Sequence, residues 1–203
     1  MTPVRVGRAF FARYTPLVAR ELIGCLLVRR LGDRRLSGII VEAEAYRGGG
    51  DPASHAYGGK TPRNSVMYGE AGHAYVYFVY GFHNCLNITT EAVGTPGAVL
   101  IRAIEPKEGS PEMLRNRGGP GVKHLTDGPG RMTQALSIDR ELNWEDLAKS
   151  ASLYLEFGEG NMDVVAGPRV GVNSAKERRW RFCMQGSRFV SDPKPPGFRR
   201  TIN

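Results

Sequence analysis

Short apolar segments separated by polar turns run along most of the chain, and this pattern favours strands over long helices. Alternating or apolar runs predict strands at 25–31, 36–46, 73–80, 84–90, 97–104, 152–157, 164–172 and 180–184. The polar turn 32–35 is short enough to join its neighbouring strands as a hairpin. The order of the segments predicts an α+β fold: a single compact domain, residues 1–203, with a curved and mainly antiparallel β-sheet, surrounding helices and a protruding β-hairpin.

Helix signals are few and predict short helices at 15–23, from residue 110, at 132–138 and at 144–150. In the first of them, Thr15 is the expected N-cap, Pro16 takes the first helical position and Gly24 follows the end. Residues 47–72 and 117–130 are rich in turn-forming residues and predict long loops, which in compact domains are usually functional or disordered. Because the chain has no strand–GxGxxG–helix unit and no P-loop, we expect no nucleotide cofactor.

The net charge bears on the kind of partner that the protein binds. The net charge is +8, and a basic protein attracts polyanions such as nucleic acid, although a merely soluble basic protein has the same balance. The excess lies at the two ends. Residues 1–40 hold eight arginines against two acidic residues, and 169–203 hold nine basic residues against two. Residues 41–168 hold eleven basic and sixteen acidic residues, so the carboxylates available for chemistry lie in the middle.

The three cysteines are odd in number and have no C-x-x-C spacing, which fits neither a disulfide framework nor a zinc site and favours a reducing compartment. Arginines at 5, 8 and 13 interrupt any signal peptide core, and no apolar stretch is long enough to cross a bilayer. We therefore expect an intracellular protein that is not secreted and has no membrane partner. It would lie in the cytoplasm or nucleoid of a bacterium, or in the nucleus of a eukaryote. The chain has no heptad pattern, so we expect a monomer.

The strand 36–46 carries the main candidate chemistry. Alternation predicts that Glu42, Glu44 and Tyr46 share one face, and that Val41, Ala43 and Ala45 share the other. The apolar residues before them indicate burial, so the carboxylates would form the floor of a cleft, although a solvated strand face has the same spacing. Arg102 interrupts the apolar strand 97–104 and needs a partner, which is Glu42 or Glu44 on a neighbouring strand, or a phosphate.

Three tyrosines mark the strand 73–80. Tyr75 and Tyr77 lie on one face, and Tyr80 lies on the other beside the glycine of the turn. Their rings would stack on bases, or one at the hairpin tip would wedge between base pairs, although tyrosine is also common in ordinary strands. His55 lies in the long loop, where a lone histidine is usually solvated. No Cys, His or Asp spacing forms a metal site, and no nucleophile elbow is present.

The order of several motifs is more specific than any one of them. The chain contains, in order, V-E-A-E-A-Y, H-A-Y-G-G-K-T-P-R-N, A-Y-V-Y-F-V-Y-G, L-N-I, V-L-I-R-A-I-E-P, L-T-D-G-P-G-R-M-T-Q-A-L and R-V-G-V. This series resembles the alkyladenine (3-methyladenine) DNA glycosylase family over about residues 9–191. The resemblance implies an enzyme that flips an alkylated or deaminated purine out of duplex DNA and hydrolyses its N-glycosidic bond. It implies no cofactor and no lyase step.

The resemblance also implies roles for individual residues. Glu44 matches the general base that activates water, and Arg102 with the main chain near Val99 matches groups that hold this water. Residues that match the base pocket are Tyr46, His55, Tyr75, Tyr77 and Asn87, the last screening against the exocyclic amine of guanine. Tyr80 matches the residue that inserts into the duplex. Positions that match DNA-backbone contacts are Thr61, Arg63, Arg131 and Arg140.

Two other functions remain open from the residues alone. A basic β-rich module that binds structured RNA without chemistry would also use tyrosine stacking and basic ends. An RNA-binding module does not explain the buried pair of Glu44 and Arg102, because carboxylates repel phosphate. A glycosidase acting on free nucleosides would not need the basic ends or Tyr80, and its binding to duplex would lack strong salt dependence.

Overall fold

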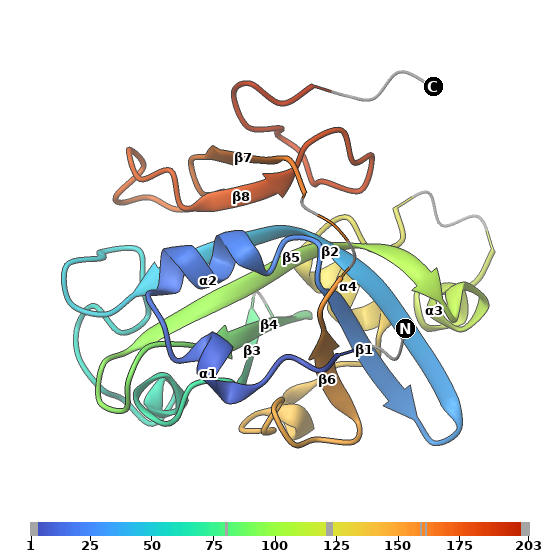
Figure 1. Cartoon of the computed structure of the whole chain (residues 1–203), viewed down its shortest axis with the longest axis horizontal. Coiled ribbons are helices and arrows are strands. Elements are labelled where there is room, and N and C mark those ends of the chain that lie inside the picture. Colours follow the sequence, from blue (N-terminus) through green and yellow to red (C-terminus); the bar gives the residue numbers. More distant parts are fainter. Residues whose placement is uncertain (1–3, 80, 121–123, 159, 161, 200–203) are drawn as a thin grey trace.

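The computed structural model describes residues 4–79, 81–120, 124–158, 160 and 162–199. Within them, eight antiparallel strands form one curled sheet in the order β3-β4-β5-β2-β1-β6, with β8 paired to β2 and β7 to β8 (Figure 1). The strands are β1 (Leu26–Leu31), β2 (Arg34–Arg47), β3 (Ala74–Val79), β4 (His83–Thr89), β5 (Gly97–Glu108), β6 (Leu153–Glu156), β7 (Val164–Gly167) and β8 (Arg181–Met184). The predicted α+β fold with a curved antiparallel sheet is confirmed.

Short helices cover the sheet. They are α1 (Arg8–Phe11), α2 (Thr15–Glu21), α3 (Ser110–Asn116) and α4 (Pro129–Ala135), with 3-10 turns η1 (Ser65–Tyr68) and η2 (Arg140–Leu142). Buried side chains of α2 and α4, including Val18 and Met132, belong to the same main core as the apolar face of the sheet. No helix in the described ranges is long and apolar enough to cross a membrane.

The two faces of the sheet have different roles. Ala43, Ala45, Val99 and Ile101 of β2 and β5 point into the main core. The alternate side chains therefore point to the opposite face, where Glu44 and its neighbours lie. The expectation that Val41 shares a face with Ala43 and Ala45 is wrong. The β2–β5 register shifts on both sides of Glu42, and this bulge places Val41 in a second cluster with Ala103, Cys183 and Val190.

Several predicted elements end elsewhere for local reasons. Residues 144–150 form turns instead of a helix, and Trp144 has a left-handed φ of 73° that a helix does not allow. The predicted strand 164–172 stops at Gly167, because Pro168 follows and the Arg169 side chain turns inward. The strand that we expected to end at Glu105-Pro106 continues to Glu108, with Pro106 opposite Gly38 at a register shift.

The first helix confirms the predicted location but not the predicted cap. Tyr14 is the N-cap, and Pro16 lies in the first turn. The Thr15 hydroxyl instead contacts Thr90 Oγ1 at 2.9 Å and donates to Glu91 Oε1 at 2.8 Å. It therefore ties the helix to the β4–β5 connection.

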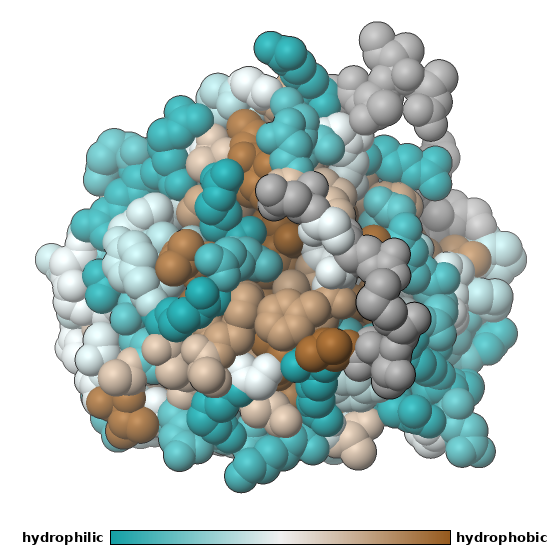
Figure 2. Space-filling model, in the orientation of Figure 1, coloured by the Kyte–Doolittle hydropathy of each residue, from teal (hydrophilic) through white to brown (hydrophobic). Residues whose placement is uncertain are grey.

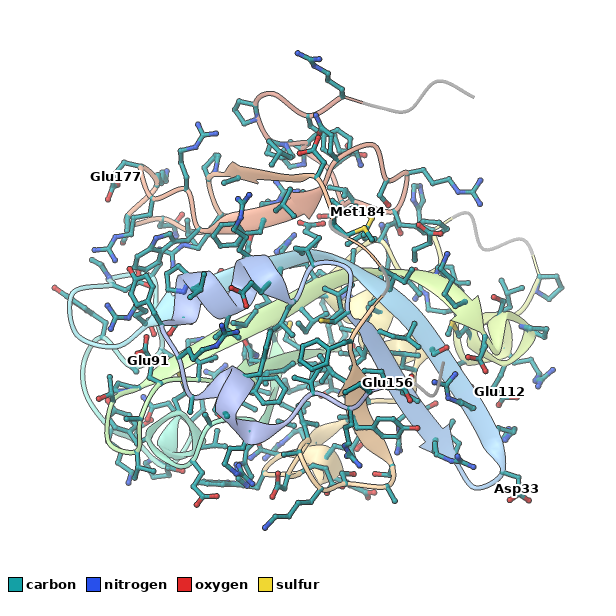
Figure 3. All side chains as sticks on the ribbon, in the orientation of Figure 1. Asp33, Glu91, Glu112, Glu156, Glu177 and Met184 are labelled. Carbon is teal, nitrogen blue, oxygen red and sulfur yellow. The ribbon has the colours of Figure 1, made fainter. Side chains whose placement is uncertain are left out.

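Ion pairs within the protein neutralise part of the positive charge of the N-terminal region. Arg34 pairs with Glu112, and Arg35 pairs with both Glu108 and Glu156. Figure 3 shows Glu112 and Glu156 on either side of the β1–β2 hairpin, whose turn carries Asp33. The arginine excess at this end is thus partly neutralised within the molecule.

Apolar side chains gather near the centre of the face shown in Figure 2, within a largely hydrophilic rim. Phe10 and Phe157 meet edge to face at 5.5 Å between ring centroids. Together with the bridge between Arg5 and Glu156, this contact fastens the N-terminal segment to β6.

Candidate active site

A cavity of about 650 Å³ opens on the face of the sheet opposite the main core. This volume is in the range of pockets that hold small organic ligands. Its lining comes from β2 to β5, the loop 47–72, the start of α4 and the segment after β7. Predicted site residues among the lining are Tyr46, His55, Tyr75, Tyr77, Asn87, Arg102 and Arg131.

Glu44 lies directly beneath this cavity and is fully buried. Its Oε1 accepts a hydrogen bond from the main-chain N–H of Val170 at 2.7 Å, and its Oε2 accepts one from the Tyr46 hydroxyl at 2.8 Å. Arg102 Nη1 lies 3.5 Å from the same Oε2. All three neighbours line the cavity, and Glu44 lies behind them.

Glu42, two residues earlier, has a different environment. Its Oε1 accepts from Arg102 Nε at 2.7 Å, Arg181 Nε at 2.8 Å and Ser191 Oγ at 2.9 Å. Its Oε2 accepts from the main-chain N–H of Ser191 at 2.7 Å. Three donors crowd Oε1 and one binds Oε2, so most of the lone-pair sites of Glu42 are occupied. The prediction that Arg102 pairs with Glu42 or Glu44 is confirmed for both.

Burial raises the pKa of Glu44 above its ordinary value of 4.5. Arg102, the N–H of Val170 and the Tyr46 hydroxyl oppose that rise because they stabilise the carboxylate form, whereas the charge on Glu42 adds to it. Burial disfavours the charged form of Arg102. The neighbouring Glu44 and Glu42 outweigh this effect and raise the pKa of Arg102, which stays cationic. The site thus combines Glu44, a carboxylate whose pKa is raised by burial, with Arg102, a guanidinium that stays cationic.

Aromatic side chains form one wall of the cavity. His55 Nδ1 lies 2.9 Å from the Tyr75 hydroxyl, and the His55 and Tyr77 ring centroids are 4.7 Å apart. Burial lowers the pKa of His55, and the charge of Arg63 lowers it further, so the imidazole is neutral at neutral pH. Because Nδ1 is engaged with Tyr75, the neutral imidazole leaves Nε2 as its one hydrogen-bonding atom for a flat ligand.

The loop that carries His55 is ordered by a buried amide. Asn64 is 1 % exposed, and its Nδ2 donates to the carbonyls of His55 at 2.8 Å and Gly59 at 2.9 Å. Its Oδ1 accepts from the main-chain N–H of Thr61 at 2.7 Å. These bonds fix the backbone around His55, whose side chain lines the cavity and remains exposed to solvent.

The remaining predicted residues differ in their exposure. Asn87 is buried beside Tyr75, and its Nδ2 donates to the Tyr75 carbonyl at 3.2 Å. Side chains at the surface, where a partner would reach them, are Thr61, Arg63, Arg131 and Arg140. Arg63 also lies over the Tyr77 ring at 5.2 Å, and Arg131 pairs with Asp127. Tyr80 lies outside the described residues.

Two features around Glu44 escaped prediction. One is the main-chain N–H of Val170 that donates to Glu44 Oε1. The buried pair of Asp51 and Arg169 was not predicted either. The available signals were the R-V-G-V motif and the isolated Asp51 in the loop 47–72, but neither reveals a contact across 118 residues.

Cys85 also lines the cavity, but burial raises the pKa of its thiol to about 11, so it is not a thiolate nucleophile at neutral pH. In the described part of the chain, no cluster of three or more His, Cys, Asp or Glu side chains is arranged to hold a metal ion. Glu44, held behind the cavity lining, has lone pairs that its two hydrogen-bond donors do not occupy. A carboxylate in this position can stabilise an oxocarbenium-like sugar, which is the chemistry of enzymes that hydrolyse glycosidic bonds.

Comparison with known proteins agrees with this class. The model of the methylpurine-DNA glycosylase family matches residues 9–188. Proteins from Desulfitobacterium hafniense and Carboxydothermus hydrogenoformans are both 46 % identical to this chain, over 92 % and 91 % of it and 98 % and 97 % of their own lengths. One from Methanocella arvoryzae is 48 % identical over 93 % of this chain and 96 % of its own. All three are provisionally named 3-methyladenine DNA glycosylases.

The chain belongs to the methylpurine-DNA glycosylase family. Membership makes the protein a DNA N-glycosylase, and DNA its partner.

Proposed function

We propose that the protein flips an alkylated or deaminated purine out of duplex DNA into this cavity and hydrolyses its N-glycosidic bond with water activated by Glu44. The observation that carries the proposal is the Glu44 carboxylate held beneath an aromatic cavity by Tyr46, Arg102 and Val170. A base inside a duplex is out of reach of this carboxylate, so the nucleotide must be extruded first.

The aromatic wall supports binding of a damaged base. Tyr46 and Tyr77 present rings on which a purine stacks, and an electron-poor or cationic alkylpurine gains a cation–π contribution of about 0.5–2 kcal/mol. Neutral His55 and Tyr75 supply hydrogen-bonding groups at the edge. Asn87 would contact the purine where guanine carries its exocyclic amine.

Free lone pairs decide between the two carboxylates. Glu42 has four hydrogen-bond donors around it, whereas Glu44 has two and an arginine at 3.5 Å. Glu44 is therefore the less occupied carboxylate, and each of its oxygens keeps a lone pair that can accept a proton from water. Its negative charge also stabilises the oxocarbenium-like sugar that forms as the bond breaks. Its raised pKa brings it nearer to the operating pH, as general base catalysis requires.

Direct hydrolysis, without strand cleavage, is supported by the described residues that line the cavity. A lyase step needs a Schiff base with a lysine or an N-terminal amine. Among the described residues that line the cavity there is no lysine. A cationic leaving base needs no proton, so one carboxylate suffices, whereas a neutral base such as hypoxanthine also needs a proton and should be released more slowly.

Excision from defined duplexes tests this function. Each duplex carries one 7-methylguanine, hypoxanthine or ethenoadenine, and strand breaks are measured with and without hot alkali. We expect breaks only after alkali treatment, fastest for 7-methylguanine, and no borohydride-trapped complex. An undamaged duplex is the control. Binding without release of any base would contradict the proposal, and breaks before alkali would contradict direct hydrolysis.

A further inference from the structure

Asp51 and Arg169 form an ion pair beside the site whose side chains are both fully buried. Arg169 Nη1 donates to Asp51 Oδ2 at 2.7 Å, and Nη2 donates to Oδ1 at 2.7 Å. Nη1 also donates to the Ala45 carbonyl at 2.9 Å, on the strand segment between Glu44 and Tyr46. This guanidinium is therefore attached to the strand that carries the proposed base.

Stability alone does not explain this pair. Removing two charges from water costs about as much as their attraction returns, so a buried ion pair is often no more stable than apolar residues in its place. Burial on its own would raise the pKa of Asp51. The hydrogen bonds from Arg169 and from the main-chain N–H groups of Arg47 and Ala53 outweigh this effect and lower it. Asp51 is thus a permanent anion that also fixes the start of the loop carrying His55.

Arg169 reaches both hydrogen-bond donors of Glu44. Its guanidinium carbon lies 4.7 Å from the centre of the Tyr46 ring, whose hydroxyl donates to Glu44. The guanidinium is fully buried and does not line the cavity, so it contacts the ring from within the protein. The next residue, Val170, provides the main-chain N–H that donates to the other oxygen of Glu44.

We propose that Asp51 and Arg169 are positioning residues whose buried pair fixes the Tyr46 hydroxyl and the Val170 amide on Glu44. The inference rests on the proposed role of Glu44. When the pair is broken, the two donors lose their fixed orientation and Glu44 keeps its proton to a higher pH. Arg102 and Glu42 also face Glu44 and do not touch Asp51. The charge of Arg169 itself acts on Glu44, so its removal in a variant raises the pKa of Glu44 in the same direction.

Two variants test the pair, with Asp33→Asn in the exposed β1–β2 turn as the matched control (Figure 3). In Asp51→Asn, an amide group that donates replaces one of the two carboxylate oxygens that accept from Arg169. The double variant Asp51→Asn/Arg169→Met leaves no buried charge unpaired, so it keeps the test valid if the single variant fails to fold. The measurements are the folded fraction, duplex affinity, and the single-turnover rate of 7-methylguanine excision against pH.

We expect the rate per folded molecule to fall by about 10- to 100-fold in both variants, with duplex affinity unchanged. We also expect the acid limb of the pH profile to move to higher pH, because Glu44 loses two groups that lower its pKa. A wild-type rate per folded molecule would overturn the proposal. A lower rate with an unshifted pH profile would also overturn it, since this is the result for a merely structural pair.

A second readout separates this inference from the proposed function. The Glu44 carboxyl carbon is followed by ¹³C NMR during a pH titration of the labelled protein and is assigned by its loss in Glu44→Gln. In both variants we expect its midpoint at higher pH than in the wild-type protein. If the wild-type protein excises no base, the proposed function fails, while an unshifted midpoint overturns the positioning role by itself.

Discussion

Replacing Glu44 with glutamine is expected to lower the single-turnover rate of base excision by about 10²- to 10⁴-fold, the usual contribution of a general base. Glutamine keeps the size of the side chain, and its carbonyl oxygen still accepts from the Val170 N–H. The Tyr46 hydroxyl turns to accept from the new amide. The side chain is fully buried and its contacts lie within the protein, so duplex affinity should be unchanged.

Rates with enzyme in excess and affinities for a lesion-containing duplex measure this effect. The control is Glu21→Gln at the exposed end of α2, the helix on the core face of the sheet, and it should match the wild-type protein. A Glu44→Gln variant that excises 7-methylguanine within about threefold of the wild-type rate, well below the general-base range, would show that another group activates water.

Replacing Arg102 with methionine is expected to lower the free energy of unfolding by about 3–5 kcal/mol. Arg102 is 8 % exposed and is the cation that contacts both Glu42 and Glu44. Without it Glu42 retains Arg181 and Ser191, but Glu44 is left with a buried charge and no adjacent cation. At neutral pH this corresponds to a fall in Tm on the order of 10 °C for a domain of this size.

The loss should depend on pH in a defined direction. Removing Arg102 removes a charge that lowers the pKa of Glu44, so this already raised pKa rises further. A carboxyl with a raised pKa in the folded state destabilises that state when ionised. The deficit should therefore be largest at neutral pH and shrink as the pH falls and Glu44 takes up its proton. Thermal unfolding from pH 4.5 to 8 measures it, with Arg20→Met on the surface of α2 as control. A deficit that grows on acidification would contradict this account.

Local patterns predicted most of the elements and one central contact. Alternation located β2 and β3, and the rule that a buried charge needs a partner correctly linked Arg102 to Glu42 and Glu44. The aromatic wall was also visible, since Tyr75 and Tyr77 had to share a strand face. These features depend on neighbouring residues in the sequence, or on adjacent strands.

Features that depend on contacts across the fold were missed. The bulge at Glu42 shifts the alternation, which the even pattern of Val41–Tyr46 does not reveal. The donor from Val170 and the pair of Asp51 with Arg169 depend on how the chain after β7 passes over β2. Trp144 adopts its left-handed φ while its N–H bonds the Ala74 carbonyl, a contact between distant segments that overrides helix capping signals.

The pH dependence of single-turnover excision of 7-methylguanine, compared between the wild-type protein and Glu44→Gln, tests the role of Glu44 most directly. For the wild-type protein we predict a rate that rises tenfold per pH unit and levels off above an apparent pKa higher than 4.5, because Glu44 must be ionised. No descending limb is expected, since a cationic base leaves without a proton. Glu44→Gln should give a slow rate without this acid limb. The same acid limb in Glu44→Gln would contradict the assignment of Glu44 as the general base.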